Sequence, residues 1–79
     1  MSTRMSPIIY PNPATGKFYI GGVKFPVEIS IFNSRGVKIL SPRMIGDNNE
    51  LDLSHHPGGI YFVTFSHNGE LCIRRLVIY

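Results

Sequence analysis

The apolar residues of this chain recur with a period of two rather than 3.6, and turn-forming residues separate the runs. The clearest alternation spans residues 27–32, where Val27, Ile29 and Ile31 fall on one face. A period of two places alternate side chains on opposite faces of an extended strand, whereas an amphipathic helix has apolar positions every three or four residues. The pattern therefore predicts short β-strands along the chain, no helix, and an all-β sandwich or barrel.

Counting the alternating runs gives six to seven strands, with characteristic turn residues between them. The expected strands span residues 7–10, 17–20, 27–32, 37–40, 51–54, 60–66 and 71–79. Gly36 closes a turn that begins at Asn33, and these two residues suit the ends of a type I turn. Asn68-Gly69 is the strongest hairpin signal, because both central residues of a type I′ turn need a positive φ.

Two segments interrupt the alternation. Residues 41–49 are rich in Pro, Arg, Gly, Asp and Asn, and we expect a loose loop there. In the last strand Leu71 and Ile73 lie on one face and Leu76 and Ile78 on the other, with two arginines between them. Either a β-bulge at the arginines returns both pairs to the core, or the strand is buried on both faces in the centre of a sheet.

The inward positions of the expected strands define a core that two packed sheets would enclose. The predicted core residues are Phe18, Ile20, Val27, Ile29, Ile31, Val37, Ile39, Leu51, Leu53, Tyr61, Val63, Phe65, Leu71, Ile73, Leu76 and Ile78. Tyr19, Phe32 and Phe62 fall on the outward faces instead. They either adjoin, as a patch of partner-binding size, or are scattered singly, and both alternatives are open.

Composition limits the chain to a single domain of 79 residues. Cys72 is its one cysteine, so no internal disulfide can stabilise the fold. The net charge of +3 comes from dispersed basic residues, which favours a solvated surface over nucleic-acid binding. No apolar run is long enough for a membrane-spanning helix. We expect residues 1–6 to be a leader, disordered or derived from cloning, and residues 7–79 to form the domain.

Candidate catalytic and metal-ligating residues are few. His55 and His56 are adjacent, with Asp52 and His67 as potential further ligands. Adjacent residues of an extended strand point to opposite faces, so we expect solvent-facing turn histidines rather than a metal site. Cys72 lies in an expected strand, where a small apolar residue is a better interpretation than a reactive thiolate. The sequence thus predicts no catalytic residue, no metal ligand and no cofactor.

The order of the turn and strand motifs resembles the C-terminal sorting domains of type IX secretion cargo in Bacteroidetes. The residues that carry the resemblance are Pro11, Asn12, Pro13, Gly16, Gly36, Leu51, Asp52, Leu53, Gly59, Tyr61, Asn68 and Gly69, followed by the basic pair Arg74-Arg75. Each mark alone is weak, but their order and spacing together make a specific signal. His56 departs from the pattern, since such domains usually have an apolar residue there.

The resemblance implies a seven-stranded antiparallel Greek-key sandwich of immunoglobulin-like type at the end of a larger exported protein. Its partners would be the outer-membrane secretion machinery, namely a translocon shuttle and a sortase-like peptidase. The protein would pass through the periplasm to the cell surface or the medium, and the domain would not be an enzyme. We expect the partner-binding residues to be Arg74, Arg75, Tyr79, Phe32 and Phe62. We expect a monomer, with a strand-mediated dimer as the alternative.

The rival hypothesis is a fibronectin-like or immunoglobulin-like module that adheres to carbohydrate or acts as a spacer beside a secreted enzyme. Aromatic residues on an outer face would favour adhesion. Position in the natural protein distinguishes the two, because a sorting domain must end its parent and a spacer need not.

Overall fold

The structure, a computed structural model, describes residues 5–46 and 50–79, and within these ranges it contains strands and turns but no helix. The strands are β1 (Ile8–Tyr10), β2 (Lys17–Gly21), β3 (Val27–Asn33), β4 (Lys38–Ile45), β5 (Leu51–Asp52), β6 (Gly59–His67) and β7 (Glu70–Ile78). Isoleucine, valine, phenylalanine and tyrosine dominate their inward positions, as β-propensity predicts. The all-β prediction is confirmed.

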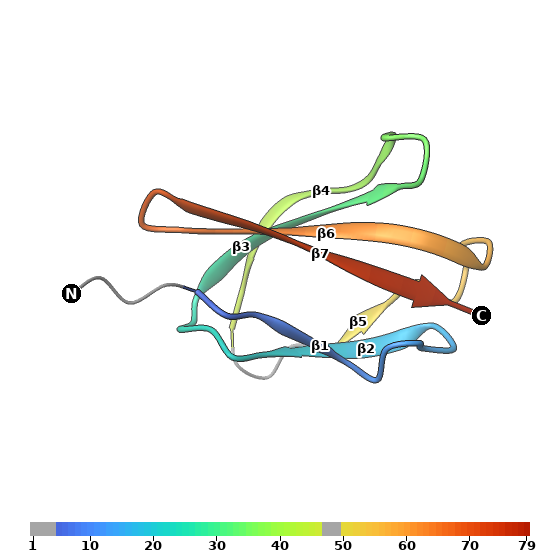
Figure 1. Ribbon diagram of the computed structural model, residues 1–79, viewed down its shortest axis with the longest axis horizontal. Coiled ribbons are helices and arrows are strands. Elements are labelled where there is room, and N and C mark those ends of the chain that lie inside the picture. Colours follow the sequence, from blue (N-terminus) through green and yellow to red (C-terminus); the bar gives the residue numbers. More distant parts are fainter. Residues whose placement is uncertain (1–4, 47–49) are drawn as a thin grey trace.

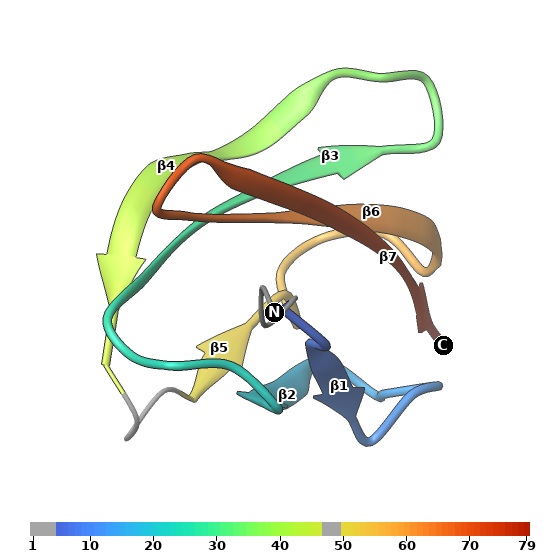
Figure 2. The ribbon, with the colours of Figure 1, turned by 60° about the vertical axis from the view of Figure 1, so that its left-hand side comes forward.

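The strands form two antiparallel sheets that face each other across one core (Figure 1). The small sheet has the order β1-β2-β5 and the large sheet the order β4-β3-β6-β7. Figure 2 shows that β4 and β5 lie at one side of the molecule and β1 and β7 at the other. Each sheet therefore has an inner face toward the core and an outer face open to solvent.

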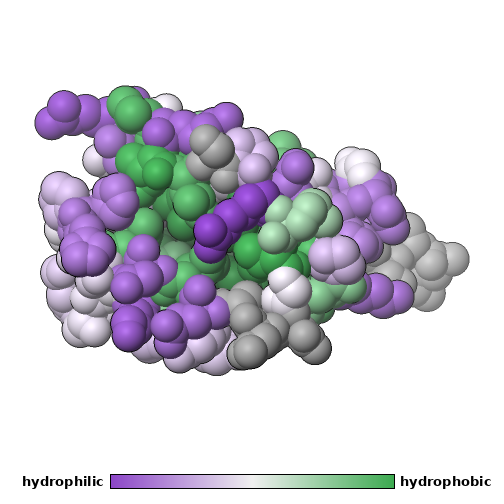
Figure 3. Space-filling view, turned by 180° about the vertical axis from the view of Figure 1, so that it is seen from behind, coloured by the Kyte–Doolittle hydropathy of each residue, from purple (hydrophilic) through white to green (hydrophobic). Residues whose placement is uncertain are grey.

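Alternate residues of the strands supply the core, as the period of two predicts. Phe18 on β2 and Val27, Ile29 and Ile31 on β3 are fully buried between the sheets. Burying one such side chain stabilises the fold by roughly 1.5–3 kcal/mol. Three core residues were not predicted, namely Ile9, Ala14 and Ile45. Figure 3, which looks from behind, shows apolar side chains across the middle of the β4 and β5 side with hydrophilic ones around them.

The loop expected at residues 41–49 is wrong up to Ile45, because β4 continues to that residue and pairs with β3. The register shifts twice along this pair, which places extra residues on the β4 side. Bulges of this kind accommodate Pro42 in an edge strand, where its missing N–H is tolerated. Residues 47–49 lie outside the described residues.

The predicted burial of Val37 is also wrong, since its side chain is 56% exposed. Asn33 donates its N–H to the Val37 carbonyl across the hairpin at 2.9 Å, so Val37 lies at the end of the strand pair, next to the turn. The tip of this hairpin rises away from the small sheet (Figure 1), and the Val37 side chain remains exposed. Ile39 is only partly buried.

Both predictions for the last strand are wrong. The pairing of β6 with β7 runs without a shift from Gly59–Ile78 to His67–Glu70, so no bulge interrupts it, and β7 is an edge strand. Leu71 and Ile73 consequently stay on the outer face, 69% and 54% exposed. The hairpin turn itself is confirmed, because Asn68 and Gly69 have φ values of 50° and 81°.

Candidate functional site

The Pro-Asn-Pro motif lies along the outer edge of β7 and joins the two sheets. The Oδ1 atom of Asn12 accepts the Val77 N–H at 3.0 Å, and its Nδ2 donates to the Arg75 carbonyl at 2.8 Å. Ala14 continues this contact. Its N–H donates to the Val77 carbonyl at 2.8 Å, and its carbonyl accepts the Tyr79 N–H at 2.9 Å. The amide side chain of Asn12 thus replaces a strand residue beside prolines that have no N–H to donate.

Replacing Asn12 by Ala should lower the free energy of unfolding by about 1–3 kcal/mol, because two hydrogen bonds of about 0.5–1.5 kcal/mol each are lost. Asn12→Asp keeps the acceptor for the Val77 N–H and loses the donor to the Arg75 carbonyl. Its free energy of unfolding should lie between that of the unchanged chain and that of Asn12→Ala. Urea unfolding followed by circular dichroism measures both. An unchanged midpoint for Asn12→Ala would show that the motif does not hold β7.

The Leu-Asp-Leu motif fixes β5 against the start of β2. Leu51 and Leu53 are buried, and the Leu53 N–H donates to the Gly16 carbonyl at 2.8 Å. Asp52 points outward, where its Oδ1 accepts the Ser54 N–H at 2.8 Å. Hydrogen bonds from Ser54, its side chain first, lower the pKa of Asp52. Gly16 and the leucines are therefore structural, and Asp52 closes the turn that follows them.

Tyr61 holds the loop that leads into β6. Its ring is buried, and its hydroxyl donates to the Pro57 carbonyl four residues upstream. Gly59, with a φ of 145°, lies between them at the start of the strand. At the β3–β4 turn, the Gly36 N–H donates to the Asn33 carbonyl at 3.0 Å. These marks of the sequence pattern thus hold the loop before β6 and the β3–β4 turn in place.

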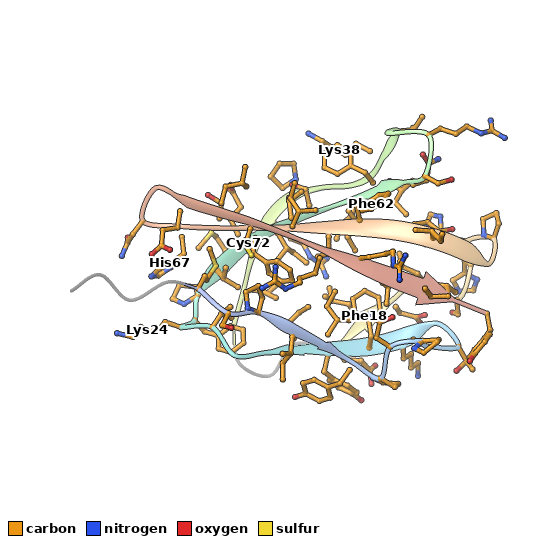
Figure 4. All side chains as sticks on the ribbon, in the orientation of Figure 1. Phe18, Lys24, Lys38, Phe62, His67 and Cys72 are labelled. Carbon is orange, nitrogen blue, oxygen red and sulfur yellow. The ribbon has the colours of Figure 1, made fainter. Side chains whose placement is uncertain are left out.

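One row of aromatic and basic side chains crosses the outer face of the large sheet. Phe32 lies beside Phe62, Phe62 beside Arg75, and Lys38 beside Phe32, each on a neighbouring strand. The Lys38 Nζ lies 5.6 Å from the centroid of the Phe32 ring, within the range of a cation–π contact. Figure 4 shows Lys38 and Phe62 on the outer side of the large sheet. We call these four residues the aromatic row.

Exposed apolar side chains extend the aromatic row along the β6–β7 hairpin. Ile60 precedes Phe62 on the same face of β6, and Ile73 and Leu71 precede Arg75 on the same face of β7. All three are exposed. Tyr19 belongs to the small sheet, so it does not join Phe32 and Phe62 in one patch. The two phenylalanines do adjoin.

Arg74 and Tyr79 lie away from the aromatic row. The Arg74 side chain points to the inner side, where its Nε donates to the Pro7 carbonyl at 3.1 Å and Nη1 lies 3.0 Å from the Cys72 sulfur. It thereby ties the start of the chain to β7. The Tyr79 side chain is exposed beside the last residues of β7. Of the five predicted contact residues, the structure brings together Phe32, Phe62 and Arg75.

Sequence reasoning missed Lys38, although a signal for it exists. A type I turn followed by a glycine with positive φ commonly adds one residue to a hairpin loop. Gly36 has a φ of 83°, and the added residue places Lys38 opposite Phe32. A simple two-residue loop would have set a different register.

The described residues contain no group of three or more His, Cys, Asp or Glu that could hold a metal ion. His55 and His56 are exposed in the loop after β5, and Cys72 is half-buried against Arg74. Within the same part of the chain there is no helix of the length and hydropathy that would span a membrane.

Comparison with known proteins agrees with the resemblance in the motifs. A family model described as a secretion system C-terminal sorting domain matches residues 8–79. A search of curated proteins finds no match. The matched region includes all seven strands, the Pro-Asn-Pro motif and the terminal hairpin. The chain therefore belongs to the family of secretion-system C-terminal sorting domains, and it is a sorting signal for type IX secretion.

Proposed function

We propose that the secretion machinery recognises this domain through the outer face of its large sheet, with the aromatic row at the centre of the contact. The domain directs export of its parent protein to the cell surface or the medium. The observation that carries the proposal is the adjacency of Phe32 and Phe62 between two cations, Lys38 and Arg75, on the outer face of the large sheet.

The chemistry of this face matches the general composition of binding surfaces. Aromatic residues and arginine are enriched among the residues that dominate binding energy, and apolar neighbours exclude water from them. Phe62 and Arg75 are exposed, as are Ile60 and Ile73 beside them. Because each side chain belongs to a different position of a paired sheet, their relative placement requires the folded state. A folded surface, rather than a linear tail, is therefore the feature recognised.

The partners that we propose are a translocon shuttle at the outer membrane and a sortase-like peptidase, met after transit through the periplasm. A cargo domain would precede the chain. The family is not catalytic, and we propose that this chain has no enzymatic activity and binds neither a cofactor nor nucleic acid. We also propose that the sorting domain begins at residue 7 and that residues 1–6 are a leader outside it.

We further propose a Greek-key arrangement of immunoglobulin-like type. The sheet orders β1-β2-β5 and β4-β3-β6-β7 support it, because the connection from β4 to β5 changes sheets and β6 returns beside β3. Tyr61 supports it as well. A tyrosine near the start of the sixth strand, bonded to the backbone a few residues upstream, is typical of such sandwiches.

The test is secretion of a reporter fused to this chain in a host that has the type IX machinery. Phe62→Thr and Arg75→Glu should each reduce the secreted fraction about tenfold, the effect of losing about 1.4 kcal/mol at a central contact. Threonine is chosen because it suits a strand. The reporter should accumulate in the periplasm.

Ile8→Thr is the matched control, since Ile8 is an exposed apolar residue on the outer face of the small sheet. Its secretion should equal that of the unchanged chain. Thermal unfolding of all three variants shows whether each is folded. Normal secretion of folded Phe62→Thr and Arg75→Glu would refute the proposed surface.

We also propose that the domain is a monomer. Asn12 and Ala14 cover the outer edge of β7 from Arg75 onward, and the other edge of the large sheet carries bulges and Pro42. Covered and bulged edges disfavour pairing with a second chain. Sedimentation at several concentrations should give one species, and a mass that rises with concentration would instead indicate the strand-mediated dimer.

A further inference from the structure

Two tyrosines form a near-parallel pair on the outer face of the small sheet, opposite the aromatic row. Tyr10 on β1 and Tyr19 on β2 are cross-strand partners. Their ring centroids lie 5.8 Å apart with 27° between the ring planes. Tyr10 is 49% exposed and Tyr19 38%. Ile9 precedes Tyr10 and Phe18 precedes Tyr19, and both of these residues are buried. Because successive side chains of a strand point to opposite faces, both tyrosine rings lie on the solvent side.

The position of each ring is fixed by a neighbour. A Cβ atom at Gly21 would lie 3.2 Å from Cε1 of Tyr10, so the absence of a side chain lets this ring lie close against the sheet. The hydroxyl of Tyr19 donates to Glu50 Oε2 at 2.9 Å. That hydrogen bond, together with the charge of Glu50, raises the pKa of Tyr19. Rings held in advance lose little conformational entropy on binding.

Polar groups of both signs border the two rings. The Lys17 Nζ lies 4.0 Å from Glu50 Oε1, and Lys17 pairs across the strands with Asp52. These side chains offer one ammonium donor and two carboxylate acceptors beside the two exposed rings. The carboxylates outnumber the ammonium, so the border carries a net negative charge that disfavours an anionic ligand.

We propose that Tyr10 and Tyr19 form a platform that binds a polysaccharide chain. The C–H face of a pyranose ring is flat and apolar and would stack on the tyrosines, while its hydroxyls would bond to Glu50, Asp52 and Lys17. An extended proline-rich peptide needs an aromatic-lined groove. Three hollows of the described surface are lined by other residues, among them Met5, His67 and Tyr61. Two exposed rings bordered by hydrogen-bonding groups, with carboxylates in excess, fit a neutral glycan better than an anionic one.

The test is native electrophoresis of the full chain in gels that contain a soluble β-glucan, xylan or mannan. At least one of these polysaccharides should retard the protein. Tyr10→Ala and Tyr19→Ala should each raise the dissociation constant derived from the retardation about tenfold. Tyr19→Phe, which keeps the ring and loses the bond to Glu50, should show a smaller loss. Phe62→Ala, on the opposite sheet, should bind as the unchanged chain does.

Nuclear magnetic resonance of the unchanged chain gives a reading that does not depend on any variant. Addition of a matching oligosaccharide should shift the ring protons of Tyr10 and Tyr19 and leave those of Phe62 in place. Retardation by none of the polysaccharides, or equal retardation of folded Tyr10→Ala, overturns the proposal. Capture of a protein on this face without any glycan binding would do the same. Reporter secretion, which tests the aromatic row, is independent of either result.

Discussion

Truncation of Phe18 to alanine should remove a large part of the stability of this domain. Phe18 has no exposed surface and lies between the two sheets (Figure 4). Phenylalanine-to-alanine changes in a packed core cost about 3–5 kcal/mol, through the lost transfer free energy and the cavity that remains. A domain of this length has a total stability of about 4–12 kcal/mol. Its single cysteine allows no internal disulfide to offset the loss.

Urea unfolding monitored by circular dichroism measures this effect, and Phe62→Ala is the matched control. Both changes delete the same phenyl ring, but Phe62 is 37% exposed on the outer face. Its truncation should cost at most about 1 kcal/mol, the scale of a cross-strand pair contact. Similar losses at the two positions would contradict the assignment of the inner and outer faces.

Gly16→Ala should be the most damaging change at a glycine of the sequence motifs. Gly16 has a φ of 147°, a region that residues with a side chain rarely adopt, and its added Cβ would lie 2.8 Å from the Ser54 Cβ and 3.0 Å from the Ser54 Cα. Backbone strain costs about 1–3 kcal/mol and overpacking a similar amount. We therefore expect a loss of about 2–6 kcal/mol. The midpoint of thermal unfolding should fall accordingly.

Gly36→Ala measures the cost of backbone strain at a positive φ without a steric clash of the added Cβ. Gly36 also has a positive φ, 83°, but no atom lies within 4 Å of the position that its Cβ would occupy. Strain alone should then cost about 1–2 kcal/mol. If Gly16→Ala and Gly36→Ala lose the same stability, close packing of the first turn against Ser54 does not contribute.

Much of this fold follows from local pattern. Val27, Ile29 and Ile31, and likewise Val63 and Phe65, are buried as their alternation predicts, because a strand that has one dry face needs an apolar residue at every second position. The turn at Asn68 follows from backbone sterics alone. The alternation and the turn signal each depend on a few consecutive residues, so both can be read from the sequence alone.

The candidate site could be predicted only in part. Phe32, Phe62 and Arg75 are recognisable as outward residues of strands, yet their adjacency depends on the pairing of β3 with β6 and of β6 with β7. Arg74 and Arg75 are neighbours with the same chemistry, and pattern alone assigned them the same role. Their opposite placement results from an unbroken register in β7, which turns Arg74 toward Pro7.

By itself the sequence determined the strands, most of their inward faces, the hairpin turns and the membership of a sorting-domain family, since all of these depend on local spacing. Tertiary structure decided that Leu71 and Ile73 face solvent, that Asn12 pairs with β7, and which aromatic side chains meet on each outer face. The physical reason is that strand order and sheet edges are set by contacts between residues far apart in the chain, and a period of two does not record which strands will be neighbours.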